Sequence, residues 1–188
     1  MKQPWKLPKY PLLHAASTVL ILAAIGSTLA QEQTTPRVKA PDFAARSLAN
    51  DAVPKLSALA AEKVVLLNFW ASWCYPCLLE MPEFEKLHAQ FKDQGFTVVA
   101  VSVYDEFEPA KAFQDEHKFS FPMLFDHKKE ATERFFVEVV PQTYLIGRDG
   151  MLIPIPNPKT GKAKLKVNDP TIWVQPETYD FIAEVLQR

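Results

Sequence analysis

The chain has little cysteine and little glycine, and both shortages limit what it can be. Only two cysteines occur in 188 residues, Cys74 and Cys77, so several disulfides cannot hold the fold together. Five glycines stand against sixteen prolines, which indicates rigid turns and extended connections. Because 48% of the residues are hydrophobic, the chain can bury an ordinary core, and we expect one globular domain.

Charge of one sign is also lacking. The chain has 21 basic and 22 acidic residues, spread without long blocks, for a formal net charge of -1. Nucleic-acid binding domains usually show a basic face, and nothing here predicts one. We therefore expect no nucleic-acid partner.

The first thirty residues predict export. Lys2, Lys6 and Lys9 precede an apolar run over residues 15–30 that ends in small side chains. This pattern is typical of a signal peptide, and an uncleaved N-terminal membrane anchor is the alternative. In both cases the positive-inside rule places the following chain outside the cytoplasm. Residues 31–39 lack apolar periodicity and predict a linker, so the folded domain is expected over residues 40–188.

The rest of the chain predicts alternating strands and helices. Residues 64–70 form an apolar run typical of a strand buried on both faces. A helix is expected to begin near Pro76, to bend at Pro82 and to end at Gly95. Further strands are expected over 96–103, 121–125, 142–146 and 151–155, and further helices over 108–118, 128–137 and from Pro176 onward. Together they predict an α/β fold with a central mixed sheet flanked by helices, preceded by an N-terminal β-hairpin over residues 41–59.

Residues 154–170 stand apart from this pattern. Lys162, Lys164 and Lys166 alternate with Ala163, Leu165 and Val167, which predicts a strand with lysines on one face. Lysines commonly keep an edge strand from aggregating. A basic docking surface for a partner is the other interpretation.

The spacing of the two cysteines indicates redox chemistry. Two cysteines separated by two residues at a strand-to-helix junction lie about one helical turn apart, close enough to form a disulfide. Cys74 should sit at the helix N-terminus, where backbone amides and the helix dipole favour the thiolate, so it is the predicted nucleophile. Cys77, one turn into the helix, would resolve the mixed disulfide by attacking Cys74.

Other roles for the pair stay open on the residues alone. A structural disulfide would close too short a loop to stabilise the fold strongly. A zinc site would need further ligands, and His88, His117 and His127 lack suitable spacing. A Cu(I) carrier or a non-catalytic interaction domain is the main alternative, because thiolates suit Cu(I). No Thr-x-x-Cys motif of a peroxidase occurs.

The residues around the pair resemble a known family. The motif and the strand before it are similar to the TlpA/ResA-like branch of the thioredoxin superfamily, over Leu67-Asn68-Phe69-Trp70-Ala71-Ser72 and Trp73-Cys74-Tyr75-Pro76-Cys77. Three further segments resemble that family: Ala40-Pro41-Asp42-Phe43, Glu80-Met81-Pro82 and Val140-Pro141-Gln142-Thr143. The resemblance implies a thioredoxin-like fold, no cofactor and no metal.

The resemblance also assigns roles to individual residues. It implies that Pro141 follows a cis peptide bond and that its loop, with Val140, receives an extended substrate. Glu80 would be a buried acid that handles protons for the cysteines, in place of the aspartate that ordinary thioredoxins carry where this chain has Asn68. A solvated helix glutamate is the alternative for Glu80.

Aromatic and apolar residues flank the motif. Trp73, Tyr75 and Pro76 are expected to shape the substrate side of the site, whereas Trp70 is expected in the core. Core packing is also expected for Leu79, but one of Leu78 and Leu79 must face outward or sideways, and an apolar docking patch beside the site is the alternative. Tyr75 places no cation beside the thiolate, which favours a reductant or an intermediate reduction potential over a strong oxidant.

The function that follows is a thiol-disulfide oxidoreductase outside the cytoplasm, expected in the periplasm. Its partners would be protein thiols and disulfides. The resemblance further implies a membrane-associated electron donor and a task such as cytochrome c maturation.

Overall fold

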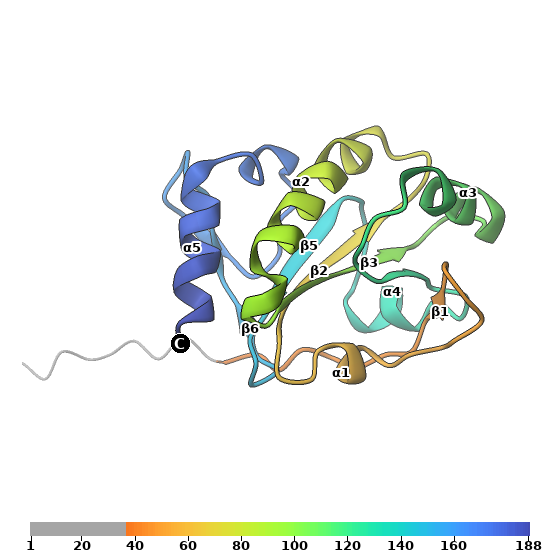
Figure 1. Ribbon diagram of the computed structural model, residues 1–188, viewed down its shortest axis with the longest axis horizontal. Helices are drawn as coiled ribbons and strands as arrows, with labels where there is room; N and C mark the ends of the chain where they lie inside the picture. Colours follow the sequence, from red (N-terminus) through yellow and green to blue (C-terminus); the bar gives the residue numbers. More distant parts are fainter. Residues whose placement is uncertain (1–36) are drawn as a thin grey trace, which may run out of the picture. The chain divides into compact units, whose positions relative to one another are not determined.

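The computed structural model describes residues 37–188, so the signal peptide or anchor expected over residues 1–30 lies outside the described residues. Within them, six strands form a mixed sheet in the order β1-β4-β3-β2-β5-β6 (Figure 1). The strands are β1 (Arg46–Ser47), β2 (Val64–Trp70), β3 (Phe96–Ser102), β4 (Met123–Phe125), β5 (Gln142–Ile146) and β6 (Leu152–Ile153). The expected α/β fold with a central mixed sheet is confirmed.

The two central strands are buried on both faces, as their apolar runs predict. β2 pairs in parallel with β3 and antiparallel with β5. Side chains at even positions of β2, such as Leu66 and Trp70, belong to one hydrophobic cluster, and odd positions such as Leu67 and Phe69 belong to another. The period of two in a strand thus divides the core between the two faces of the sheet.

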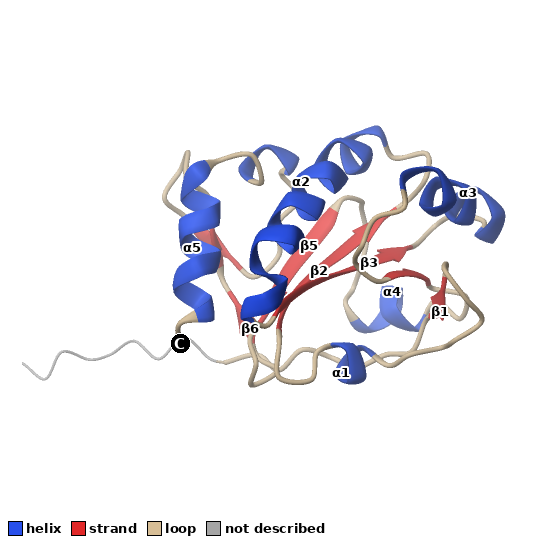
Figure 2. Ribbon diagram, in the orientation of Figure 1, coloured by secondary structure: helices blue, strands red, loops and turns tan. Residues whose placement is uncertain are grey.

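Helices cover both faces (Figure 2). The helices are α1 (Leu56–Leu59), α2 (Tyr75–Phe91), α3 (Phe107–His117), α4 (Glu130–Arg134) and α5 (Pro176–Leu186), with short 3₁₀ turns η1 (Lys92–Gln94) and η2 (Pro170–Ile172). Helices α2, α3 and α5 pack on the face that carries Trp70, and α1 and α4 pack on the opposite face. α2 continues through Pro82, and α5 begins at Pro176 as predicted.

The N-terminal hairpin forms only in part. The chain turns back on itself, and a single antiparallel bridge joins Ala44 to Lys55. Between them, β1 pairs with β4 and so becomes the edge of the central sheet. The returning arm ends in the short helix α1 rather than in a strand.

Two other expectations are wrong in detail. Residues 154–170 do not form one strand: β7 (Ile155–Pro156) pairs with β8 (Ala163–Lys164), and Val167 separately bridges Thr143 of β5. The helix expected over 128–137 shortens to α4, and Phe136 just beyond it has a φ of 48°. An α-helix cannot continue through a residue with this left-handed backbone.

Candidate active site

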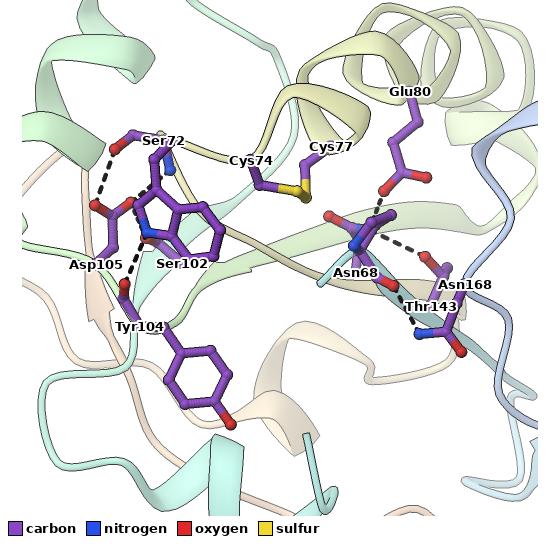
Figure 3. Close-up of a disulfide and its surroundings, with 12 residues drawn as sticks. Asn68, Ser72, Cys74, Cys77, Glu80, Ser102, Tyr104, Asp105, Thr143 and Asn168 are labelled. Carbon is purple, nitrogen blue, oxygen red and sulfur yellow. Dashed lines mark hydrogen bonds between the residues drawn. A yellow bond between two sulfur atoms is a disulfide. The ribbon is translucent and has the colours of Figure 1, made fainter. Parts of the chain in front are cut away.

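Cys74 and Cys77 lie where the sequence predicts, at the junction of β2 and α2. Cys74 occupies the N-cap position of α2, and a disulfide joins it to Cys77 with 5.3 Å between the Cα atoms (Figure 3). The Cys77 amide donates to the Cys74 carbonyl, which begins the helix. Cys74 is 4% exposed and Cys77 is fully buried. An incoming nucleophile therefore meets Cys74 first, and the helix N-terminus favours its thiolate.

Glu80 lies one turn beyond Cys77 and is buried, with 1% of its surface exposed. The carboxylate accepts hydrogen bonds from Asn68 Nδ2 to Oε1 at 2.7 Å and from Trp173 Nε1 to Oε2 at 3.0 Å. Burial raises the pKa of Glu80 to about 8, and the two hydrogen bonds act in the opposite direction. Glu80 is therefore a buried acid and not a solvated helix residue.

Asn68 holds Glu80 from the sheet. It occupies an even position of β2, on the face that α2 covers, and it is fully buried. Its Nδ2 also donates to Thr143 Oγ1 of β5 at 3.0 Å. Figure 3 shows the disulfide and the Glu80 carboxylate both directed from α2 toward Asn68.

Pro141 and the cysteines lie at the same end of the central strands. β5 runs antiparallel to β2 with Phe69 opposite Gln142, so the end of β2 meets the start of β5. The Val140–Pro141 peptide bond is cis. Val140 is partly buried against the cluster that contains both cysteines. Asn168 Nδ2 donates to the Pro141 carbonyl at 2.7 Å.

Apolar side chains surround the cysteines on the outside. Trp73 is 63% exposed and Tyr75 is 69% exposed, and Pro76 is exposed as well. The indole of Trp73 donates to the Tyr104 carbonyl at 2.9 Å, which ties the ring to the loop after β3. Trp70 is buried in the core, as expected.

Leu79 corrects one expectation. It is 56% exposed, whereas its neighbour Leu78 packs against the core. Because successive helical residues point about 100° apart, only one of two adjacent leucines can face the sheet fully. Leu79 therefore adds to the exposed apolar surface near Tyr75.

Asp105 organises the cysteine loop and is not among the site residues predicted from the sequence. Asp105 follows β3 and accepts hydrogen bonds from the Ser72 amide at 2.6 Å and from the hydroxyls of Ser72 and Ser102, each at 2.9 Å. The adjacent Tyr104 has a φ of 55° and its hydroxyl donates to the Val137 carbonyl. The sequence does contain a signal for this contact: Ser72 follows β2 and Asp105 follows β3. Because these strands are parallel, their C-terminal ends lie next to each other.

Residues 37–188 contain neither a metal-binding cluster nor a membrane-spanning helix. No cluster of three or more His, Cys, Asp or Glu side chains there is arranged to hold a metal ion. None of the helices in that part of the chain has the length and apolarity to cross a membrane.

Comparison with known proteins agrees with this geometry. The AhpC/TSA family model matches residues 36–154. The thiol-disulfide oxidoreductase ResA of Oceanobacillus iheyensis is 32% identical over 157 residues, which cover 79% of this chain and 81% of ResA. The thioredoxin-like protein YneN of Bacillus subtilis is 39% identical over 118 residues, 61% of this chain and 66% of YneN.

A solved structure shares the fold. A Chlorobium tepidum protein designated thiol:disulfide interchange protein DsbE superposes with a TM-score of 0.61 at 28% identity, over 80% of this chain and 94% of that one. The thioredoxin-like fold expected from the resemblance is thus confirmed. The chain belongs to the AhpC/TSA family and, within the thioredoxin superfamily, to the ResA-like thiol-disulfide oxidoreductases.

Proposed function

We propose that the protein reduces disulfides of exported proteins in the periplasm, with Cys74 as nucleophile, Cys77 as resolving cysteine and Glu80 as their proton acceptor and donor. The observation that carries the proposal is the placement of the Cys74–Cys77 pair at the start of α2, with the buried Glu80 one turn further on. The substrate side of the site is formed by five residues that border the pair: Trp73, Tyr75, Pro76, Val140 and Pro141.

The reaction starts from the reduced pair. The Cys74 thiolate attacks one sulfur of a substrate disulfide, forms a mixed disulfide and releases the other substrate sulfur as a thiolate, which takes a proton from water. The ionised form of Glu80 then takes the proton of Cys77, and the Cys77 thiolate attacks the Cys74 sulfur. The second substrate sulfur leaves as a thiolate and takes a proton from water, and two electrons have passed from the cysteine pair to the substrate.

Glu80 completes the proton balance in the return step. A dithiol donor reduces the pair by attacking Cys74, and Cys77 leaves as a thiolate. The second thiol of the donor then attacks the mixed disulfide, releases Cys74 as a thiolate and leaves the donor oxidised to a disulfide. Because the pKa of Glu80 is about 8 in the oxidised protein, it carries a proton at neutral pH and can pass it to Cys77. The same group therefore serves both directions of exchange.

Location and partners belong to the same proposal. The lysine-bounded apolar run at the N-terminus supports export, with either release into the periplasm or retention by an anchor in the inner membrane. A membrane-associated dithiol donor would then regenerate the reduced pair. Apocytochrome c, whose haem-binding cysteines must be reduced, is the class of substrate that the ResA-like family suggests.

Trapping tests the proposal. Cys77→Ser leaves Cys74 able to attack but removes the resolving thiol, so mixed disulfides with periplasmic proteins should accumulate in cells. Their identification by mass spectrometry names the substrates. Cys74→Ser is the matched control and should trap none. Equal capture by both variants, or no capture by Cys77→Ser, would contradict the proposed mechanism.

A further inference from the structure

A segment beyond the matched family region contacts the site at three places. The family match ends at residue 154, and residues 167–173 follow it. Val167 exchanges two backbone hydrogen bonds with Thr143 of β5, at 2.8 and 3.0 Å. Asn168 donates to the Pro141 carbonyl, and Trp173 donates to Glu80. The segment therefore contacts both the proline loop and the buried acid.

Trp173 is held firmly in its position. It is buried and packs edge-on against Phe84 of α2, with 5.3 Å between ring centroids. The backbone on either side of it is fixed as well: Asp169 accepts from the Thr171 amide at 2.9 Å, and Thr178 Oγ1 donates to the Ile172 carbonyl at 2.6 Å. The indole N–H thus points at Glu80 from a buried, closely packed ring.

The hydrogen bond from Trp173 favours one ionisation state of Glu80 over the other. An indole N–H can donate a hydrogen bond but cannot accept one. It therefore stabilises the carboxylate more than the protonated acid. Without this donor the Glu80 carboxylate would still pay the free energy of desolvation but would have one hydrogen bond fewer to compensate for it.

Few other groups can act on Glu80. β2 and β3, beneath α2, carry no titratable side chain. Asp169 before η2 and Tyr179 on α5 are titratable, and neither contributes to the pKa of Glu80. On α2 itself Glu83 and His88 are titratable, and neither contributes to the pKa of Glu80. Cys74 and Cys77 do not titrate while the disulfide is closed.

We propose that Trp173 is a positioning residue that holds the Glu80 carboxylate and sets the pH at which it ionises, so that the C-terminal segment tunes the redox site. The step from this tuning to catalysis depends on the role proposed above for Glu80. The hydrogen bond itself does not depend on that role.

Titration of the oxidised protein tests Trp173 directly. The Glu80 carboxyl can be followed by infrared spectroscopy, with Glu80→Gln used to assign its band. Trp173→Phe keeps an aromatic ring but removes the donor, and the pKa of Glu80 should rise by about one pH unit. Benzothienylalanine at position 173 keeps the bicyclic shape without the N–H, so it serves if Phe leaves too large a cavity.

Trp70→Phe is the matched control. Trp70 is equally buried on the same face of the sheet, but its indole N–H has no hydrogen-bond partner among the described residues. This control loses the same volume and no hydrogen bond, so the pKa of Glu80 should stay unchanged. An unshifted pKa in both position-173 variants, or the same shift in Trp70→Phe, would overturn the proposal.

The pH profile of disulfide exchange separates the two proposals. If Glu80 moves the proton, the profile of Trp173→Phe should shift in the same direction as the titration. A shifted titration with an unshifted profile would support the role of Trp173 and count against Glu80 as the proton carrier.

Discussion

Glu80 accepts a hydrogen bond from Trp173, 93 residues further along the chain. The first residue lies on the helix that carries the cysteines, and the second lies just before the C-terminal helix. Through this contact the last part of the chain reaches the least exposed part of the site. The stability and the chemistry of the protein should therefore both respond to changes there.

The buried acid should make stability depend on pH. In the unfolded chain Glu80 ionises near pH 4.5, but in the folded protein its pKa is about 8. Between these values the unfolded state binds fewer protons, so the stability of the oxidised protein should fall with rising pH, by about 1.4 kcal/mol per pH unit for this one group. Glu80→Gln should remove that part of the slope. Denaturant unfolding of both proteins from pH 5 to pH 8 checks this, and parallel slopes would refute it.

Removing Asp105 should loosen the cysteine loop. Asp105→Ala leaves the Ser72 amide and the Ser102 hydroxyl without their acceptor, which should cost about 1–3 kcal/mol of stability. Exchange with protein substrates should slow as well. Asp115→Ala removes only an exposed ion pair with Lys111 and should cost less than about 1 kcal/mol. Equal losses in the two variants would argue against the proposed role of Asp105.

Asn168 should matter more for substrates than for stability. Asn168→Ala frees the Pro141 carbonyl, and exchange with protein substrates should slow by about fivefold, equivalent to about 1 kcal/mol. Asn157→Ala is the control, since Asn157 organises a turn of the same segment without contacting Pro141. Stopped-flow rates and thermal midpoints for both variants distinguish loss of positioning from general loosening of the segment.

The orientation of α2 predicts contrasting effects of two leucines. Leu79 is largely exposed and Leu87 is fully buried. Leu79→Ala should therefore change stability by less than about 0.5 kcal/mol, whereas Leu87→Ala should cost about 2–5 kcal/mol. Urea unfolding of the two variants measures both values. A large loss for Leu79→Ala would mean that this face of the helix is covered in solution.

The elements that the sequence predicted well are those marked by a local pattern in their own residues. The apolar run over residues 64–70 and the segment 142–146 became β2 and β5 with the expected bounds, and Pro176 opened the last helix. The cysteine spacing predicted that Cys74 and Cys77 lie close enough to form a disulfide, which is observed. Each of these signals lies within a few residues of the feature that it predicts.

The details that were missed depend on distant parts of the chain. Leu78 and Leu79 are alike in sequence, and only the position of the sheet decides which is buried. The period-2 pattern of residues 162–167 is real, but its pairing is shared between β7 and Thr143. Nothing in the sequence around Trp173 indicates its hydrogen bond to Glu80, which depends on how the fold brings the two residues together.

The distance along the chain between Glu80 and Trp173 also bears on shortened forms of the protein. A chain that ended before residue 173 would keep Cys74, Cys77 and Glu80 but would lack the indole donor. Proteolytic removal of the C-terminal segment should therefore change the behaviour of the pair without altering either cysteine.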